Sequence, residues 1–400
     1  MIGQKFHNKT MNEEQLDLSK TRSMTSLNIS ETLDNFYKNP DPKITKLRFD
    51  YSSLDLKNVK KISKILNENK SIKNIKLFKT KIQKDHLELL KDSFENCSLT
   101  SIDLGSNNFE SKGFDVILEG FENNKTIEEL HVSWNDIITP DMKKFFSSNH
   151  QLKILSLVGN KISGNGCKMI LNSFLNNHSL HTLDLMENLI DEIGMKYISK
   201  LLEENDTLTD LNLRRNKFNS ISLEYLSNGL KKNSTLKILN LSFCDIDYYG
   251  IKAFSEFLKE NKYLNTLKMN ENMINNKGFQ YFAECLQENC SLTSLDLAFN
   301  DRFSSKSVSE FICENDTLEE LNVAGNQWDQ KDFNLILEGL ENNRSLISLV
   351  ETYKKHLIEE DMEEKKNQIL TSNYQYKNRK KHFNCNWKFT QDVTFKFREK

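Results

Sequence analysis

One short frame of residues recurs along most of this 400-residue chain and limits what the chain can fold into. It reads L-x-x-L-x-L-x-x-N-x-F from Leu208 to Phe218, within TLTDLNLRRNKF. Most successive copies start 28 residues apart, and such a fixed period marks a repeated structural unit. Clear copies start at Leu99, Ile127, Leu152, Leu180, Leu208, Leu236, Leu264, Leu292 and Leu318. Weaker or partial copies start at Met24, Ile44, Ile72 and Leu346.

The first half of each copy predicts a short strand. Leu211 and Leu213 alternate with Asn212, which is the side-chain period of a strand with one buried face. An asparagine follows, and its amide can satisfy backbone groups left open where the chain leaves the strand. We therefore expect a stacked column of Asn107, Asn135, Asn160, Asn188, Asn216, Asn272, Asn300 and Asn326.

The second half of each copy predicts an amphipathic helix. In DEIGMKYISKLLEEN (191–205), Ile198, Leu201 and Leu202 lie on one side, with Lys and Glu opposite. Asn205 is expected to end this helix in the left-handed conformation that asparagine tolerates. One strand–helix unit cannot bury its own apolar face, so the units must stack into a solenoid.

This pattern resembles the leucine-rich repeat family, and its 28-residue period resembles the ribonuclease-inhibitor-like class of that family. The resemblance covers roughly residues 44–350. It implies an α/β solenoid of horseshoe shape, with parallel strands on the concave face and helices on the convex face. It also implies a protein partner bound on the concave face.

The two ends of the chain depart from the frame. We expect a flexible N-terminus at 1–23, an N-terminal cap at 24–43, a capping helix at 351–370 and a basic aromatic tail at 371–400. Two period-2 runs in the tail indicate a β-hairpin packed on the solenoid. A contact with nucleic acid or an anionic membrane, and disorder, are the alternatives for this tail.

Cysteine usage and the N-terminal sequence indicate a cytoplasmic protein. The seven cysteines are scattered and form no CxxC pair, which argues against disulfides and for a reducing compartment. The first residues lack the apolar segment of a secretory signal, and no apolar run is long enough for a membrane span. N-x-[ST] triplets occur, but we interpret them as helix stops. They start at Asn96, Asn124, Asn177, Asn205, Asn233, Asn289, Asn315 and Asn343.

The chain shows no sequence signature of an enzyme. It lacks HExxH, a phosphate-binding GxxxxGK[ST] loop and GxSxG, so we predict no catalytic residue, no metal site and no cofactor. Cys97 and Cys290 stand at a variable junction position and are expected to be inert. The final 50 residues are too short to resemble the catalytic domain of bacterial leucine-rich-repeat ubiquitin ligases.

The positions that vary between copies indicate a protein-binding surface. Variable strand positions line the concave face of a solenoid. Aromatic and arginine side chains recur at the two positions before the asparagine, and such side chains commonly anchor interfaces. Scattered surface aromatics are also common, but recurrence at one place in the frame favours binding. The candidates are Arg48, Tyr51, Lys76, Phe78, His131, Trp134, Asp184, Met186, Asn212, Arg214, Arg215, Phe243, Lys268 and Phe299.

Charge is spread unevenly, although the net charge is only −2. Residues 43–81 hold 12 Lys and Arg against 3 Asp and Glu, whereas the middle of the chain is acidic. An acidic or phosphate-bearing partner at these N-terminal repeats is one interpretation, and a solvated basic surface is the other. A nucleic-acid partner is not expected. The six basic residues on the predicted strands and exit loops are Lys46, Arg48, Lys73, Lys76, Lys79 and Lys81.

Two functional hypotheses follow from these observations. The first is an intracellular scaffold or adaptor that binds a protein on its concave face; from a bacterial source it would resemble an effector acting in a host cytosol. The second is a GTPase-activating protein that resembles the Ran-specific leucine-rich repeat class. Arg214 and Arg215 suggest the second, because an inserted arginine can stabilise phosphoryl transfer. However, that class resembles a solenoid followed by an acidic segment, and its activity does not rely on an arginine finger.

Overall fold

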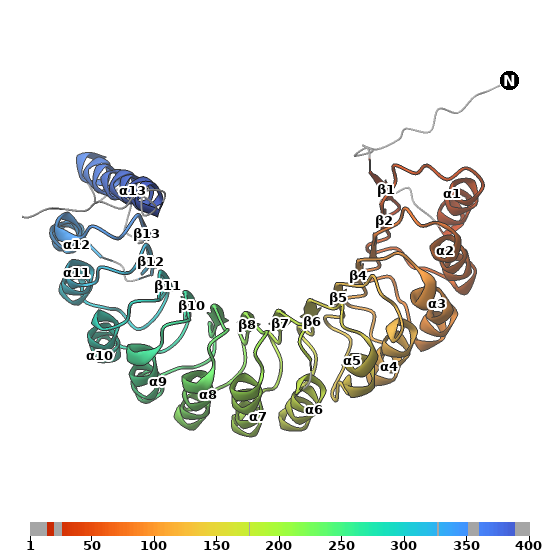
Figure 1. Ribbon diagram of the computed structural model, residues 1–400, viewed down its shortest axis with the longest axis horizontal. Coiled ribbons are helices and arrows are strands. Elements are labelled where there is room, and N and C mark those ends of the chain that lie inside the picture. Colours follow the sequence, from red (N-terminus) through yellow and green to blue (C-terminus); the bar gives the residue numbers. More distant parts are fainter. Residues whose placement is uncertain (1–13, 20–25, 176, 326–327, 351–359, 389–400) are drawn as a thin grey trace, which may run out of the picture. The chain divides into compact units, whose positions relative to one another are not determined.

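The computed structural model describes residues 14–19, 26–175, 177–325, 328–350 and 360–388. Short strands and helices alternate along the chain and form two compact units, Met1–Leu236 and Lys237–Lys400. Within each unit the strands form one layer and the helices form a second layer beside it (Figure 1). This is the α/β solenoid that the repeat predicts.

The elements of the first unit follow the repeat copies in order. They are β1 (Gln15–Asp17), α1 (Ser26–Lys38), β2 (Lys46–Arg48), α2 (Leu56–Glu68), β3 (Asn74–Lys76), α3 (Lys84–Asn96), β4 (Ser101–Asp103), α4 (Glu110–Phe121), β5 (Glu129–His131), α5 (Lys143–Ser148), β6 (Ile154–Ser156), α6 (Gly164–Phe174), β7 (Thr182–Asp184), α7 (Glu192–Glu204), β8 (Asp210–Asn212) and α8 (Ser220–Lys232).

The second unit continues the same alternation. Its elements are β9 (Ile238–Asn240), α9 (Tyr248–Glu260), β10 (Thr266–Lys268), α10 (Asn276–Gln287), β11 (Ser294–Asp296), α11 (Ser305–Glu314), β12 (Glu320–Asn322), α12 (Gln330–Asn342), β13 (Ser348–Val350) and α13 (Glu360–Lys388).

In each unit the strands are parallel and their order in the sheet follows the sequence. The register pairs equivalent positions of successive copies, such as Leu183 with Leu211 in the first unit. The same holds in the second unit, where Leu267 pairs with Leu295. Since each pairing shifts the chain by one whole copy, the framework leucines stack and every copy adds one layer to the core.

The buried positions are those that the frame predicts. Leu211 and Leu213 are fully buried, and α7 buries Ile198, Leu201 and Leu202 against the strand layer. Replacing one such residue by alanine typically costs about 2–5 kcal/mol of unfolding free energy. Stability of each unit therefore rests on the stacked Leu, Ile and Phe side chains between its strands and helices.

The predicted asparagine column is confirmed in the described copies. The amide nitrogen of Asn216 donates to the carbonyl of Leu213 in its own copy at 2.9 Å and to that of Leu185 in the preceding copy at 3.0 Å. Its side-chain oxygen accepts from the backbone nitrogen of Ile190 at 3.1 Å. One buried amide thus serves two copies. Asn326, the last predicted member, lies outside the described residues.

A second asparagine column ends the helices, in a geometry that differs from the expected one. Asn205 has φ −92° and ψ 132°, which is extended backbone, so the left-handed stop is wrong. Its side-chain oxygen accepts from the backbone nitrogens of Thr207 and Leu208 at 3.1 and 2.8 Å. Its amide nitrogen donates to the carbonyl of Asn177 at 3.3 Å. Because these bonds satisfy the turn, no left-handed residue is needed.

The N-x-[ST] triplets lie where helices end, as the sequence predicts, and all but one of their asparagines are buried in the turn. Asn96 is the exception, because it is exposed while its neighbour Cys97 is buried and bonds the carbonyl of Phe94 at 3.4 Å. This copy is one residue shorter than most, so the cysteine takes the interior place. The buried asparagines are Asn124, Asn177, Asn205, Asn233, Asn289, Asn315 and Asn343.

The N-terminal segment contains a strand where a flexible chain was expected. Residues 15–17 form β1 and pair in parallel with β2, with Leu16 opposite Leu47. The partial copy expected from Met24 is wrong, because Leu27 lies in α1 and is largely exposed. Strand formation at β1 is favoured because Leu18 becomes buried and its backbone nitrogen bonds the carbonyl of Arg48. Residues 1–13 and 20–25 lie outside the described residues.

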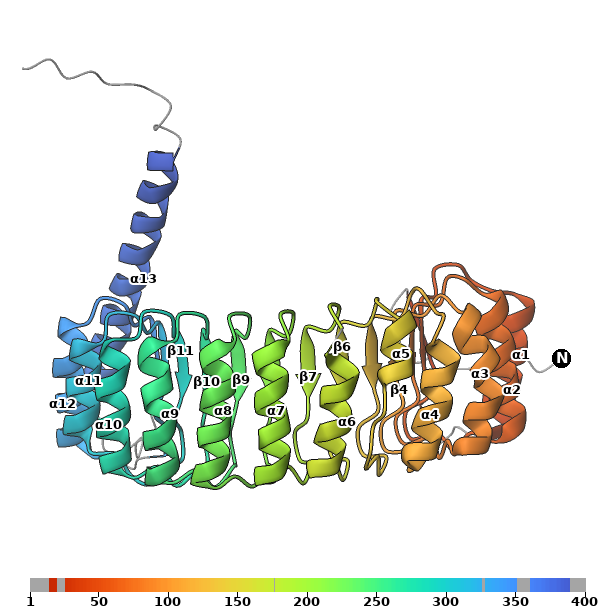
Figure 2. The ribbon, with the colours of Figure 1, turned by 60° about the horizontal axis from the view of Figure 1, so that its bottom comes forward.

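Helix α13 covers the last repeat of the second unit and then runs away from the repeat layers (Figure 2). Its Met362 packs with Phe333 and Leu337 of α12. The amide nitrogen of Asn373 donates to the carbonyl of Leu346 at 2.9 Å. In the first unit, the equivalent carbonyl is that of Leu208, and it accepts a hydrogen bond from the hydroxyl of Thr235 in the following copy. The helix therefore supplies the bond that a further repeat would have made.

The β-hairpin expected in the tail is wrong in its first run, because residues 383–388 continue α13. No glycine or proline interrupts residues 360–388. In the earlier part of α13 the buried side chains recur at helical spacing: they are Met362, Lys366, Leu370 and Asn373. Residues 351–359, where the capping helix was expected to begin, and residues 389–400 lie outside the described residues.

Candidate protein-binding surface

Two residues in each copy stand between the last buried strand residue and the asparagine, where the chain leaves the sheet. In the TLTDLNLRRNKF copy they are Arg214 and Arg215. We call these pairs the exit stripe. In the first unit it consists of Asp50–Tyr51, Phe78–Lys79, Gly105–Ser106, Ser133–Trp134, Val158–Gly159, Met186–Glu187 and Arg214–Arg215; in the second, of Ser242–Phe243, Asn270–Glu271, Ala298–Phe299 and Ala324–Gly325.

The second position of the exit stripe has a left-handed backbone in all of these pairs, with φ between 53° and 89°. Glycine or asparagine adopts this conformation at least cost, and a bulky side chain there is uncommon. The chain nevertheless places Tyr51, Trp134, Phe243 and Phe299 at this position. A non-glycine residue in this region costs of order 1 kcal/mol or more, so folding alone does not explain these aromatics.

In the first unit, two aromatic rings of the stripe lie against glycines of the next copy. A Cβ atom on Gly159 would come within 2.3 Å of the Trp134 ring, and one on Gly105 within 2.8 Å of the Phe78 ring. Only glycine leaves room for the rings in this position. Trp134 is still 45% exposed. The rings are thus held in place before any partner arrives, which reduces the entropy lost on binding.

The same arrangement recurs in the second unit. Phe299 is 53% exposed, and a Cβ atom on Gly325 would come within 2.6 Å of its ring. Phe243 is half-buried at the equivalent position two copies earlier. Lys268, the predicted binding residue of β10, is exposed on the same side of the sheet, because its neighbours Leu267 and Met269 are buried.

An aromatic and basic cluster forms the N-terminal end of the exit stripe. The Tyr51 and Phe78 rings meet edge to face at 5.6 Å, and the ammonium group of Lys79 lies 5.7 Å from the Tyr51 ring centre. On the strands beside them, Arg48 and Lys76 are register partners of β2 and β3. The structure thus brings together four predicted binding residues that are separated by up to 30 residues in sequence.

The arginine pair takes part in the exit stripe. A guanidinium nitrogen of Arg215 lies 3.5 Å from a carboxylate oxygen of Glu187 in the preceding copy. Arg214 is half-buried, and its backbone nitrogen donates to the side chain of Asn212 at 3.1 Å. Within the described residues no group of three or more His, Cys, Asp and Glu side chains is placed to hold a metal ion.

Several predicted binding residues also shape the loop. Asp184 accepts the backbone N–H of Met186 at 3.0 Å, which is the bond that Asn212 makes in the next copy. Burial raises the pKa of the Asp184 carboxyl above its usual range, although bonds to Met186 and Asn212 oppose this shift. These side chains therefore fix the start of the exit loop as well as facing solvent. His131 lies 3.7 Å from Glu129 on the same strand.

The cysteines show no reactive arrangement. Burial raises the pKa of the Cys97 thiol, and it raises that of Cys167 to about 12, which disfavours the nucleophilic thiolate. Cys290 and Cys313 are exposed, and the cysteines of the described residues carry free thiols. Cys97 thus fills the interior, whereas Cys290 lies on the surface.

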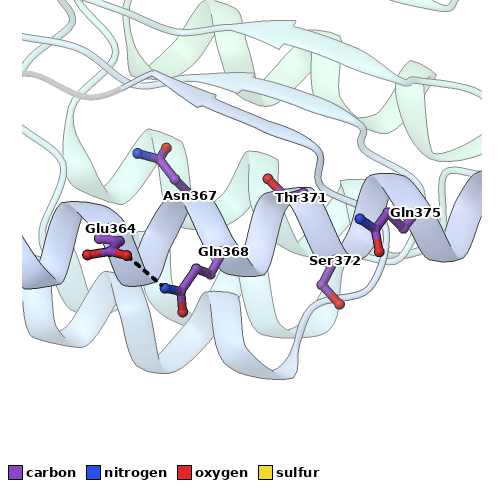
Figure 3. A pocket seen from close by; sticks show the side chains of 6 residues that line it. All are labelled: Glu364, Asn367, Gln368, Thr371, Ser372 and Gln375. Carbon is purple, nitrogen blue, oxygen red and sulfur yellow. Dashed lines mark hydrogen bonds between the residues drawn. The ribbon is translucent and has the colours of Figure 1, made fainter.

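A hollow along α13 offers little chemistry. It measures about 520 Å³ and is open, and every side chain that lines it is exposed (Figure 3). Its one carboxylate, Glu364, accepts from the amide of Gln368 at 3.2 Å. A stripe of solvated polar groups on one helix does not converge on a ligand. The lining residues are Glu364, Asn367, Gln368, Thr371, Ser372 and Gln375.

Comparison with known families agrees with the repeat seen in the sequence and the structure. A family model described as "Leucine Rich repeat" matches residues 95–117, 123–144, 148–171, 176–199, 232–255 and 288–311. Each match spans one strand and at least the start of the following helix. The chain belongs to the leucine-rich repeat family. No curated protein matches the chain by sequence.

Two solved structures are similar to this leucine-rich repeat chain at low identity. One is the complex of Rad7 and Elc1 from yeast, with 16% identity and a TM-score of 0.44, where the match covers 81% of this chain and 80% of that chain. The other is the actin-binding site 2 of leiomodin-1, with 19% identity and a TM-score of 0.29, covering 42% of this chain and 82% of that chain. Likeness at this level carries no information about partners.

The glycines of the exit stripe that contact the aromatic rings are the residues of the candidate surface that the sequence pattern missed. Gly105 and Gly159 stand in the same repeat positions as the aromatics, so a scan for binding residues passes over them. What marks these glycines in the sequence is an aromatic residue at the equivalent position of the preceding copy: Phe78 for Gly105, and Trp134 for Gly159. An aromatic followed by a glycine at the equivalent position of the next leucine-rich repeat marks this contact. Among the described helices, none is long and apolar enough to cross a membrane.

Proposed function

We propose that this leucine-rich repeat protein is a non-catalytic scaffold that binds a protein partner through its exit stripe. The observation that carries the proposal is the set of bulky aromatics at left-handed positions, where glycine would cost less. Exposed aromatics with a fixed ring position are the side chains that dominate protein interfaces. The free thiols of the described residues favour a reducing compartment for this adaptor.

The test compares the exit stripe with an exposed aromatic elsewhere. The full chain is immobilised and used to capture proteins from an extract of its own cell, with Trp134→Ala and the control Tyr249→Ala run in parallel. Tyr249 is 70% exposed at the start of α9, so it matches Trp134 in kind but lies outside the stripe. We expect Trp134→Ala to weaken the main partner at least tenfold, and Tyr249→Ala to leave it unchanged.

Two results would contradict this proposal. Equal capture by wild type and Trp134→Ala, with both proteins folded by circular dichroism, would show that the stripe is not used. Equal loss in both variants would indicate non-specific apolar contact. If the source is a bacterium, the same capture from a host-cell extract tests the effector hypothesis, because an effector is expected to bind there and not in the bacterial extract.

A further inference from the structure

The geometry points to an acidic peptide segment with one aromatic or large apolar side chain as the ligand of the first repeats. This inference deepens the proposed function by naming the chemical class of a partner, and it rests on that function. The surface consists of Lys46, Arg48, Tyr51, Lys76, Phe78, Lys79 and Lys81, and we call it the lysine–aromatic cluster.

Lysines carry the available positive charge of this cluster. The guanidinium of Arg48 is already paired with Asp50 at 2.6 Å. Lys46, Lys76, Lys79 and Lys81 are exposed, and they make no ion pair within the described part of the chain. The strands that carry Lys46 and Lys76 are adjacent and about 5 Å apart, and Lys76 lies two positions further along its strand than Asn74, the register partner of Lys46. Such a group of unpaired cations attracts an anionic ligand.

The charge changes sign farther along the sheet of the first unit. Glu129 and Asp184 are half-exposed on β5 and β7, whereas Glu187, in the loop after β7, is paired with Arg215. An acidic segment is repelled there and attracted at β2 and β3. The positive charge at β2 and β3 and the negative charge at β5 and β7 therefore direct an acidic ligand to the first repeats. Such a charge difference contributes to the specificity of binding more than to its affinity.

The two aromatic rings supply the apolar part of the site. Tyr51 is 54% exposed, and its ring meets the edge of Phe78 at 73°. Phe78 in turn lies over Gly105, so the Tyr51 and Phe78 rings form a fixed apolar surface beside the lysine ammonium groups. A carboxylate-rich segment that also carries one Phe or Leu would satisfy both halves of this surface. Charge alone would leave the rings in water.

The ring geometry favours a peptide over a single-stranded nucleic acid. Bases bind by stacking on open ring faces. Here Lys79 lies over the Tyr51 ring, and the backbone at Gly105 lies beneath the Phe78 ring. The planar donor that would grip a phosphate with two bonds, Arg48, is engaged by Asp50. Lysine ammonium groups and an edge-to-face ring pair suit carboxylates and one apolar side chain better.

Fluorescence anisotropy with the full chain tests this inference. The probe is a labelled peptide of about ten residues, rich in Glu and Asp, with one central Phe. Two control peptides replace either the acids by Gln and Asn or the Phe by Ala, and a labelled oligouridylate serves as the nucleic acid. We expect only the acidic Phe peptide to bind well, with affinity falling at least tenfold from low to high salt.

Matched protein variants separate the cluster from general charge. Lys76→Glu with Lys79→Glu should weaken the acidic Phe peptide at least tenfold. Lys57→Glu with Lys60→Glu, which changes the same charge on exposed positions of α2, should have little effect. Gly105→Ala should also weaken binding, because the new methyl group displaces the Phe78 ring without removing a charge. Circular dichroism and thermal melting establish that each variant is folded.

The inference is overturned if the acidic Phe peptide does not bind, if both lysine pairs matter equally, or if the oligouridylate binds more tightly than the peptide. Equal binding of the Phe and Ala peptides would overturn the role of the rings. The proposed function is tested separately by the partner that depends on Trp134. Retention of that partner, together with loss of this peptide interaction, would remove the inference alone.

Discussion

Trp134 has a side chain that the fold of its copy does not require. Its backbone has φ 58°, its ring rests on the backbone at Gly159 and nearly half of its surface stays in water. Neither the strand nor the helix of its copy needs the indole ring. In the equivalent position of the next copy the chain uses glycine, which shows that the loop forms without a side chain.

Replacement of Trp134 by asparagine should therefore leave the fold intact. We expect the free energy of unfolding to change by less than about 1 kcal/mol, because relief of the left-handed strain offsets the lost ring contact. Urea unfolding followed by circular dichroism measures this change. Leu130→Ala, which removes a buried side chain of the same copy, should cost about 2–5 kcal/mol. A similar cost for Trp134→Asn would mean that the ring belongs to the core.

Asp184 gives a pH-dependent test at the same scale. Burial raises its pKa, so the folded state binds this proton more tightly than the unfolded state does. The buried charge of Asp184 has no destabilising effect below the unfolded-state pKa of about 3.9. The effect grows as pH rises towards and through the raised pKa of the folded state. Asp184→Asn keeps the acceptor for Met186, as Asn212 does in the next copy, and removes the charge.

We expect Asp184→Asn to raise the melting temperature at pH 7 and to match wild type near pH 3. Thermal melts across this pH range measure the difference. A difference between the two proteins that does not vary with pH would contradict the burial argument. Asp206→Asn, at an exposed junction position, is the control.

At the scale of elements, the two asparagine columns hold successive copies together. Asn216 is fully buried and bonds three carbonyls and one backbone nitrogen in two adjacent copies. Its removal leaves buried polar groups without partners, and each such group costs about 1–3 kcal/mol. The loop and the neighbouring strand therefore depend on one side chain.

Asn216→Ala should lower the free energy of unfolding by about 2–4 kcal/mol. Lys217→Ala, the exposed neighbour, should stay within about 0.5 kcal/mol of wild type. Denaturant unfolding gives both values. Hydrogen exchange should show faster exchange at the backbone nitrogen of Ile190, and unchanged exchange there would argue against the bond assigned to Asn216.

The repeat predicts most elements because its period is long and regular, whereas both ends differ for physical reasons. Residues 16–18 read L-D-L, as residues 183–185 do, but no clear frame follows them, so β1 escapes a search for whole copies. The first run of the tail fits both period 2 and a helix, and in the structure it continues α13, whose earlier residue Met362 packs against α12. The positions of the candidate binding residues within each copy can be predicted from the sequence. The ring-on-glycine contacts are not, because they depend on side-chain rotamers between copies.

At the scale of the whole molecule, buried thiols distributed among the repeats report on unfolding. Cys97 and Cys167 in the first unit and Cys244 in the second are buried, whereas Cys290 and Cys313 are exposed. A buried thiol reacts only after its repeat opens, because reagent access and the thiolate form both require exposure.

We expect Cys290 and Cys313 alone to react rapidly with a disulfide reagent in native protein that carries Cys385→Ser. Cys97, Cys167 and Cys244 should become reactive only with the denaturant transition of their own unit. Mass spectrometry of the modified peptides identifies each site. Rapid native labelling of Cys167 would contradict the packing around α6.

The way in which Asn216 bonds has a consequence for how such a gene can change length. Asn188 gives the carbonyl of Leu157 and the backbone nitrogen of Ile162 the same bonds that Asn216 gives Leu185 and Ile190. If residues 180–207 were lost in one recombination event, Asn216 would take the place of Asn188 and would bond the carbonyl of Leu157 and the backbone nitrogen of Ile162. Insertions or deletions of whole copies are therefore tolerated, whereas loss of a few residues within a copy would break the column.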